Sequence, residues 1–168
     1  MSSKNKSKVQ PVKPQVKVIT KPAATAAKSP VAKAPLSTNR NKAQSMAQQR
    51  ASFALEKVAA VAQDKDTAKR FKAYANSLPA MIQTNGLGQA LAFAKAKGCG
   101  KGPEAPAWHA MYKALNSWLT LQEIWGAEQD VLNALVNGNQ YQYRRAQAET
   151  QALLVWIKQI SRAELAGD

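Results

Sequence analysis

Every aromatic side chain of this chain lies after residue 50, so only the later part of the sequence can supply the bulky groups of a hydrophobic core. The first of the eleven aromatic residues is Phe53, and residues 1–49 contain ten Lys or Arg, five Pro and no Asp or Glu. Such a segment buries too little apolar surface to offset the conformational entropy lost on folding. We therefore predict a disordered tail over residues 1–44 and a folded domain over residues 45–168.

The formal net charge of +14 indicates a polyanionic partner, but most of this charge belongs to the tail. Residues 50–168 carry 14 basic and 10 acidic residues, a net charge of only +4. The tail composition fits a basic arm that neutralises phosphates and equally fits a solubilising extension. A free-standing protein that compacts nucleic acid with this arm is therefore one alternative for the function.

The residue types exclude several classes of protein. A single cysteine, Cys99, and a single histidine, His109, exclude a disulfide framework, a cysteine-based zinc finger and a multi-histidine metal site. The longest apolar run, residues 152–157, is much shorter than the roughly 20 residues that cross a bilayer. The N-terminus lacks the apolar segment of a secretory signal, so we expect a cytoplasmic protein that has no membrane partner, with an organellar transit peptide as an alternative.

No complete catalytic or cofactor motif is present. Lys101 lies in a glycine-rich stretch, but Gly102 follows it where a phosphate-binding loop needs Ser or Thr. Cys99 and His109 have no obvious third group that would make them a nucleophile and its base. The ten carboxylates form no acid–base pair, and Glu149 is expected to pair with Arg145 on the same helix. We expect no metal, no cofactor and no enzymatic activity.

Apolar residues recur at helical spacing, and Val and Ile are sparse, which predicts an all-α bundle of five to seven helices with short connections. Asp64 is expected to cap the second helix, Pro79 to end it and start the third, and Gly126 is a possible break in the fifth. The third helix is apolar on all sides, which predicts a central, covered position. The expected helices span residues 46–63, 64–78, 79–97, 106–119, 121–136 and 141–165.

The last predicted helix has a basic stripe opposite its apolar face. Arg144, Gln151, Lys158 and Arg162 fall within about 40° of one another when successive residues are placed 100° apart. Such a stripe is either an ordinary solvated face or a surface that follows a nucleic-acid backbone. The opposite arc, expected to be buried, holds Ala146, Leu153, Trp156, Ile157 and Ile160.

A second polar feature interrupts the apolar third helix. Gln83, Thr84 and Asn85 precede Gly86, and Gln89 follows one turn later. These residues either satisfy buried groups or allow a neighbour to approach closely at Gly86 and Gly88, or they form a polar patch that meets a partner or RNA. The residue pattern supports both interpretations equally.

The sequence also resembles a known family. The run from Leu78 to Phe93, LPAMIQTNGLGQALAF, resembles the signature helix of the Cmr small-subunit family. The segment RASFAL from Arg50 is similar to the opening helix of that family, and YRRAQAE from Tyr143 is similar to its closing helix. The resemblance covers about residues 45–166, in the family's order, and does not include the tail.

The resemblance implies a non-catalytic small subunit of a type III-B CRISPR RNA-guided effector complex, which acts in antiviral defence. Such subunits stack in several copies along the inner side of the complex. They face the backbone subunit that carries the guide RNA, and the complex also contains a large subunit. Together they help to hold the guide RNA–target RNA duplex through contacts that do not depend on sequence, while cleavage and signalling belong to the other subunits.

This interpretation assigns roles to the polar residues. It makes the stripe of Arg144, Gln151, Lys158 and Arg162 an RNA-binding surface, and an exposed Trp108 or Trp125 would serve stacking between subunits. Secondary RNA-binding candidates are Arg50, Lys95 and Lys97. The patch for a partner or for RNA consists of Gln83, Thr84, Asn85 and Gln89.

Overall fold

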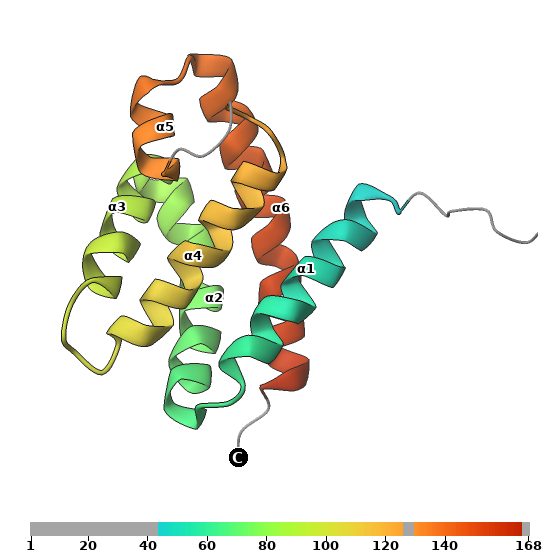
Figure 1. The fold of residues 1–168 in the computed structure, drawn as a ribbon, viewed down its shortest axis with the longest axis vertical. Helices are drawn as coiled ribbons and strands as arrows, with labels where there is room; N and C mark the ends of the chain where they lie inside the picture. Colours follow the sequence, from blue (N-terminus) through green and yellow to red (C-terminus); the bar gives the residue numbers. More distant parts are fainter. Residues whose placement is uncertain (1–43, 126–129, 166–168) are drawn as a thin grey trace, which may run out of the picture. The chain divides into compact units, whose positions relative to one another are not determined.

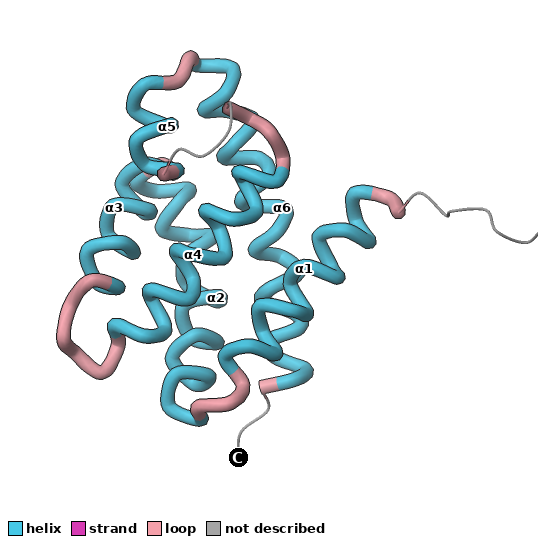
Figure 2. Tube along the Cα trace, in the orientation of Figure 1, coloured by secondary structure: helices cyan, strands magenta, loops and turns pink. Residues whose placement is uncertain are grey.

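The computed structural model describes residues 44–125 and 130–165, and within these ranges the chain forms helices and no strand (Figures 1 and 2). This confirms the predicted all-α class. The predicted tail lies outside the described residues except for Gln44. The described residues form the helices α1 (Met46–Val61), α2 (Lys65–Asn85), α3 (Leu87–Gly98), α4 (Ala105–Leu121), α5 (Val131–Asn137) and α6 (Gln140–Glu164).

Short-range hydrogen bonds cap the starts of α1, α2 and α6. Ser45 and Asn139 each form a capping box with the glutamine three residues later, which satisfies free N–H groups at the starts of α1 and α6. Asp64 caps α2 as predicted, since its carboxylate accepts a hydrogen bond from the Asp66 N–H at 3.1 Å. These helix starts follow from local sequence.

The predicted helix boundary at Pro79 is wrong. Helix α2 continues through Pro79 to Asn85, and the chain turns at Gly86, so the expected helix 79–97 is split between α2 and α3. Proline removes one helical hydrogen bond, but Leu78 and Ile82 on either side of it are completely buried. Their packing keeps the segment helical, and the break moves to the glycine.

One hydrophobic cluster holds the helices together. Helix α6 packs against α1 and α2, while α4 packs against α3 and α2 (Figure 1). The prediction that the third helix is covered on all sides is wrong for α3, because Phe93 is exposed. Leu55, expected on the buried face of α1, is exposed as well. The largest fully buried side chains include Phe71, Leu78, Leu115, Trp118 and Leu153.

The predicted helix 121–136 is also wrong over its first part. Residues 122–125 form a turn in which Glu123 has a positive φ of 48°, and the buried side chains of Ile124 and Trp125 pack from this turn into the core. Helix α5 is the part that remains. The predicted break at Gly126 lies outside the described residues.

Asp130 joins three helices at the start of α5. Its carboxylate accepts hydrogen bonds from the Leu132 N–H and the Tyr112 hydroxyl, at 3.1 and 2.7 Å, and forms an ion pair with Lys95 at 3.1 Å. The Asn116 side chain accepts a further bond from the Val131 N–H at 2.8 Å. These contacts attach α5 to α3 and α4.

Candidate nucleic-acid interface

Two of the four residues of the basic stripe lie on the exposed side of α6, as its spacing predicts. Arg144 and Arg162 are exposed, and Lys158 is half-buried. None of the three forms an ion pair with any residue that the structure describes. Arg144 and Arg162 are separated by roughly 27 Å along the axis, at 1.5 Å per residue. The stripe therefore offers three uncompensated cations along one helix face.

Gln151 differs from the other members of the predicted stripe. It is half-buried, and its side-chain amide donates a hydrogen bond to the Pro79 carbonyl at 3.1 Å. This bond joins α6 to α2 near the proline that the helix tolerates. Gln151 therefore has a structural role in addition to any contact with a ligand.

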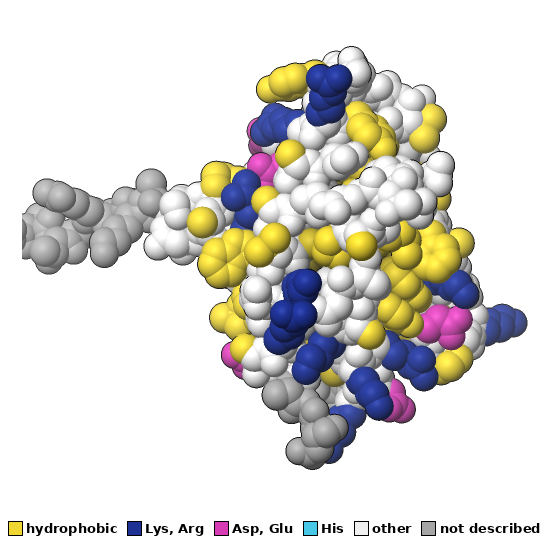
Figure 3. Space-filling view, turned by 180° about the vertical axis from the view of Figure 1, so that it is seen from behind, with side chains coloured by type: hydrophobic (Ala, Val, Ile, Leu, Met, Phe, Trp, Pro, Cys, Tyr) yellow, Lys and Arg dark blue, Asp and Glu magenta, His cyan; other side chains and the backbone are white. Residues whose placement is uncertain are grey.

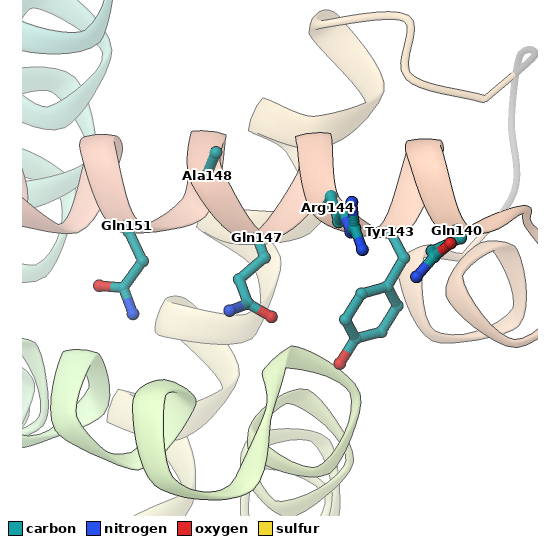
Figure 4. Close-up of a pocket in the computed structure, with 6 residues that line it drawn as sticks. All are labelled: Gln140, Tyr143, Arg144, Gln147, Ala148 and Gln151. Atoms are coloured by element: carbon teal, nitrogen blue, oxygen red, sulfur yellow. The ribbon is translucent and has the colours of Figure 1, made fainter.

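A groove follows the N-terminal half of α6, where the stripe begins (Figure 4). It has a volume of about 450 Å³. In Figure 4 the side chain of Tyr143 points toward the junction between α2 and α3. Its hydroxyl oxygen accepts a hydrogen bond from the Gly88 N–H at 3.3 Å. The lining residues are Gln140, Tyr143, Arg144, Gln147, Ala148 and Gln151.

The polar patch lies on the surface beside the Tyr143 contact. Gln83, Thr84, Asn85 and Gln89 are all exposed, so the interpretation that they satisfy buried groups is wrong. The alternative of a close approach at Gly86 is confirmed, because a β-carbon there would lie 3.1 Å from the Tyr143 hydroxyl. The fold thus brings the patch close to the beginning of the stripe, although the two are far apart in the sequence.

The three secondary RNA-binding candidates all have acidic partners within the domain. Arg50 forms an ion pair with Glu149 at 2.9 Å, and both side chains are mostly buried, at 18% and 19% exposure. The predicted pair between Glu149 and Arg145 is therefore wrong, and Arg145 donates instead to the Gln122 carbonyl at 3.2 Å. Lys95 pairs with Asp130 at 3.1 Å, and Lys97 pairs with Glu104 at 3.7 Å.

The exposure of three tryptophans differs from the prediction: two are more buried than expected and one is more exposed. Trp108 and Trp125 are only 5% and 7% exposed, so neither offers a surface for stacking between subunits. Trp108 packs instead against Tyr74, with ring centroids 3.9 Å apart. Trp156, predicted to be buried, is 36% exposed because it lies at the edge of the apolar arc of α6. Spacing alone does not show which edge of the arc a neighbouring helix covers.

The charged groups seen from the side opposite Figure 1 are mainly basic. Figure 3 shows Lys and Arg side chains over the whole height of this face, most of them in its lower half, with fewer Asp and Glu among them.

Within residues 44–125 and 130–165, no three or more His, Cys, Asp or Glu side chains group together as metal ligands. None of the described helices is long and apolar enough to cross a membrane.

A comparison with known families finds a match to this chain. The sequence profile of a family described as "CRISPR-associated protein (Cas_Cmr5)" matches residues 46–164, which is more than two thirds of the chain. The matched region begins with α1 and ends with α6, so it includes the stripe, the groove and the polar patch. No curated protein sequence matches the chain.

Proposed function

Because the chain belongs to the Cas_Cmr5 family of CRISPR-associated proteins, we propose that it is a non-catalytic small subunit of a type III-B (Cmr) effector complex. In this role, several copies stack along the inner side of the complex and help to hold the guide RNA–target RNA duplex. The partners are the backbone subunit, the large subunit, further copies of this chain and the two RNA strands. The protein acts in the cytoplasm, in antiviral defence.

The observation that carries this proposal is the stripe on α6. Arg144, Lys158 and Arg162 share one face, and no described acidic residue neutralises them. Contacts of cations with phosphates position a protein on a nucleic acid without reading its sequence. Such contacts suit a subunit whose complex takes its sequence recognition from base pairing with a guide strand.

The positions of the acidic residues support a non-catalytic role. Asp64 caps α2, Asp130 caps α5, and Glu149 and Glu104 pair with basic side chains. A general acid or base needs a carboxyl that can reach a substrate proton. Each of these four carboxylates instead has a partner within the domain, as a helix cap or in an ion pair.

The proposal predicts that reversing two charges of the stripe weakens the retention of target RNA. We expect the double variant Arg144→Glu/Lys158→Glu to keep its far-UV circular dichroism spectrum, because both side chains lie on the accessible side of α6. Complexes assembled with it should retain less target RNA at moderate salt. The slope of log affinity against log salt should fall by roughly 1.5, since each phosphate contact contributes about 0.7–0.9.

A matched control carries the same change in charge away from α6. Lys101 lies in the loop between α3 and α4, Lys113 lies on α4, and both are exposed without an ion pair to a described residue. The variant Lys101→Glu/Lys113→Glu should retain target RNA like the unmodified chain. Equal retention by the α6 variant and this control would contradict the assignment of the stripe to RNA.

A further inference from the structure

Four of the six residues that line the groove on α6 are neutral and carry a polar group at the end of an apolar side chain. Its lining includes three glutamines, one tyrosine and one arginine, and no acidic residue. An amide side chain both donates and accepts hydrogen bonds, and so does a phenolic hydroxyl. The exposed patch of Gln83, Thr84, Asn85 and Gln89, beside the Tyr143 contact, adds further neutral polar side chains. The region is therefore rich in hydrogen-bonding groups but contains a single fixed charge, that of Arg144.

This composition differs from that of a surface that binds phosphates alone. Phosphate oxygens carry charge and only accept hydrogen bonds, so their strongest contacts are with Lys and Arg. A hydroxyl group both donates and accepts, which matches the amide side chains of the groove. In an RNA duplex, the 2′-hydroxyl groups lie along a wide and shallow minor groove, where a protein surface can reach them.

Two contacts hold the groove in shape. The Tyr143 hydroxyl receives the Gly88 N–H at the start of α3, and Gly86 leaves room for that ring because it has no side chain. At the other end, Gln151 donates to the Pro79 carbonyl of α2. On the same helix, Gln147 lies between Tyr143 and Gln151, and Gln140 lies one turn before Tyr143. The packing of α6 thus sets the backbone positions of both glutamines.

We propose that this groove binds the ribose 2′-hydroxyl groups of an RNA duplex through Gln140 and Gln147, with Arg144 on an adjacent phosphate. The inference rests on the proposed function, in which α6 follows an RNA backbone. It adds that the protein distinguishes ribose from a sugar that lacks the hydroxyl group. The stripe supplies affinity for the backbone, and the groove supplies this preference.

The test compares two probes that differ only in the hydroxyl group. One is a fluorescently labelled RNA duplex, and the other is a 2′-fluoro duplex of the same sequence, which keeps the A-form geometry without a hydroxyl donor. We expect the full chain to bind the RNA duplex more tightly. The double variant Gln140→Leu/Gln147→Leu should lose this preference by about fivefold per glutamine, the effect of one net hydrogen bond of about 1 kcal/mol.

Gln159 supplies the matched control. It is exposed on α6 but does not line the groove, so Gln159→Leu should keep the full preference for RNA. All three proteins have the same charge and the same tail, so the contribution of non-specific phosphate contacts cancels between them. Far-UV circular dichroism and the affinity for the 2′-fluoro duplex show whether the variants remain folded.

The possible outcomes separate this inference from the proposed function. Equal binding of the two duplexes by the unmodified chain would overturn the inference, and this measurement needs no variant. An equal preference in the groove variant and the Gln159 control would overturn it as well. Either result leaves the stripe intact as a phosphate surface, whereas the proposed function fails only if Arg144→Glu/Lys158→Glu also binds RNA like the unmodified chain.

Discussion

Gly86 is the residue at which α2 ends and α3 begins. Its φ of 82° and ψ of 160° lie in a region of backbone conformation that is accessible almost only to glycine. A β-carbon at this position would also lie 3.1 Å from the Tyr143 hydroxyl. The glycine therefore sets the direction of α3 and leaves room for the Tyr143 hydroxyl.

We predict that Gly86→Ala lowers the free energy of unfolding by about 1–3 kcal/mol, because the alanine must adopt this strained conformation. Gly88→Ala is the matched control. Its β-carbon would lie 4.0 Å from the same hydroxyl and its φ is not positive, so this change should be neutral or stabilising by up to about 1 kcal/mol. Urea denaturation measures both, and equal midpoints for the two variants would contradict the role given to Gly86.

Arg50, in the segment that is similar to the family's opening helix, stabilises the fold by pairing with Glu149. Its guanidinium group donates to both oxygens of Glu149, in a geometry that joins α1 to α6. The two side chains are mostly buried, so the loss of either would leave a poorly solvated charge. We therefore assign Arg50 to the packing of these helices rather than to the RNA surface.

Among the helices, α5 depends most on contacts outside itself. It has only seven residues, too few to be stable alone in water. Burial alone would raise the pKa of the Asp130 carboxyl, but the hydrogen bond from Tyr112 and the contact with Lys95 outweigh this effect and lower the pKa. Burial of Tyr112 and its bond to Asp130 in turn raise the pKa of the phenol.

The lowered pKa of Asp130 predicts a loss of stability in acid. A carboxyl whose pKa is lower in the folded state stabilises the fold above its unfolded pKa of about 3.9 and loses that contribution as the pH falls through the folded value. Asp130→Asn should therefore lower the urea midpoint at pH 7. Between pH 5 and pH 3, the midpoint of this variant should fall less than that of the unmodified chain. A variant with an unchanged midpoint at pH 7 would contradict the anchoring role.

Helix α6 combines structure and proposed function along its length. Its buried side, which includes Ala146, Leu153 and Ile157, packs into the core, while the stripe occupies its accessible side. Because one helix carries both, the geometry of the stripe follows from the packing of α6 against α1 and α2. A rigid helix keeps the spacing of the cations constant.

For the chain as a whole, the two candidate functions predict opposite effects of deleting the tail. Most of the +14 net charge lies before residue 50, and a free-standing compacting protein would bind nucleic acid mainly through that segment. We predict that a chain without residues 1–44 still assembles with the other Cmr subunits and retains target RNA, because the stripe lies on α6. Co-purification and retention of labelled RNA measure this. Loss of most nucleic-acid affinity would favour the compacting protein instead.

Local patterns were enough to predict the all-α class and the Asp64 cap. These features depend on helical periodicity and on hydrogen bonds between residues close in the chain, which are already present in short segments. The exposure of Arg144 and Arg162 follows from the same periodicity. The assignment of the stripe and the groove to RNA stays a prediction.

Contacts between distant segments set the remaining features. Pro79 stays within α2 because Leu78 and Ile82 pack into the core, and Arg50 pairs with Glu149 because α1 lies against α6. Such contacts stabilise a local conformation by amounts comparable to intrinsic propensity, so they can reverse it. The contact between Tyr143 and Gly88 arises in the same way, since these residues are 55 positions apart in the sequence and meet only when α6 packs beside α2.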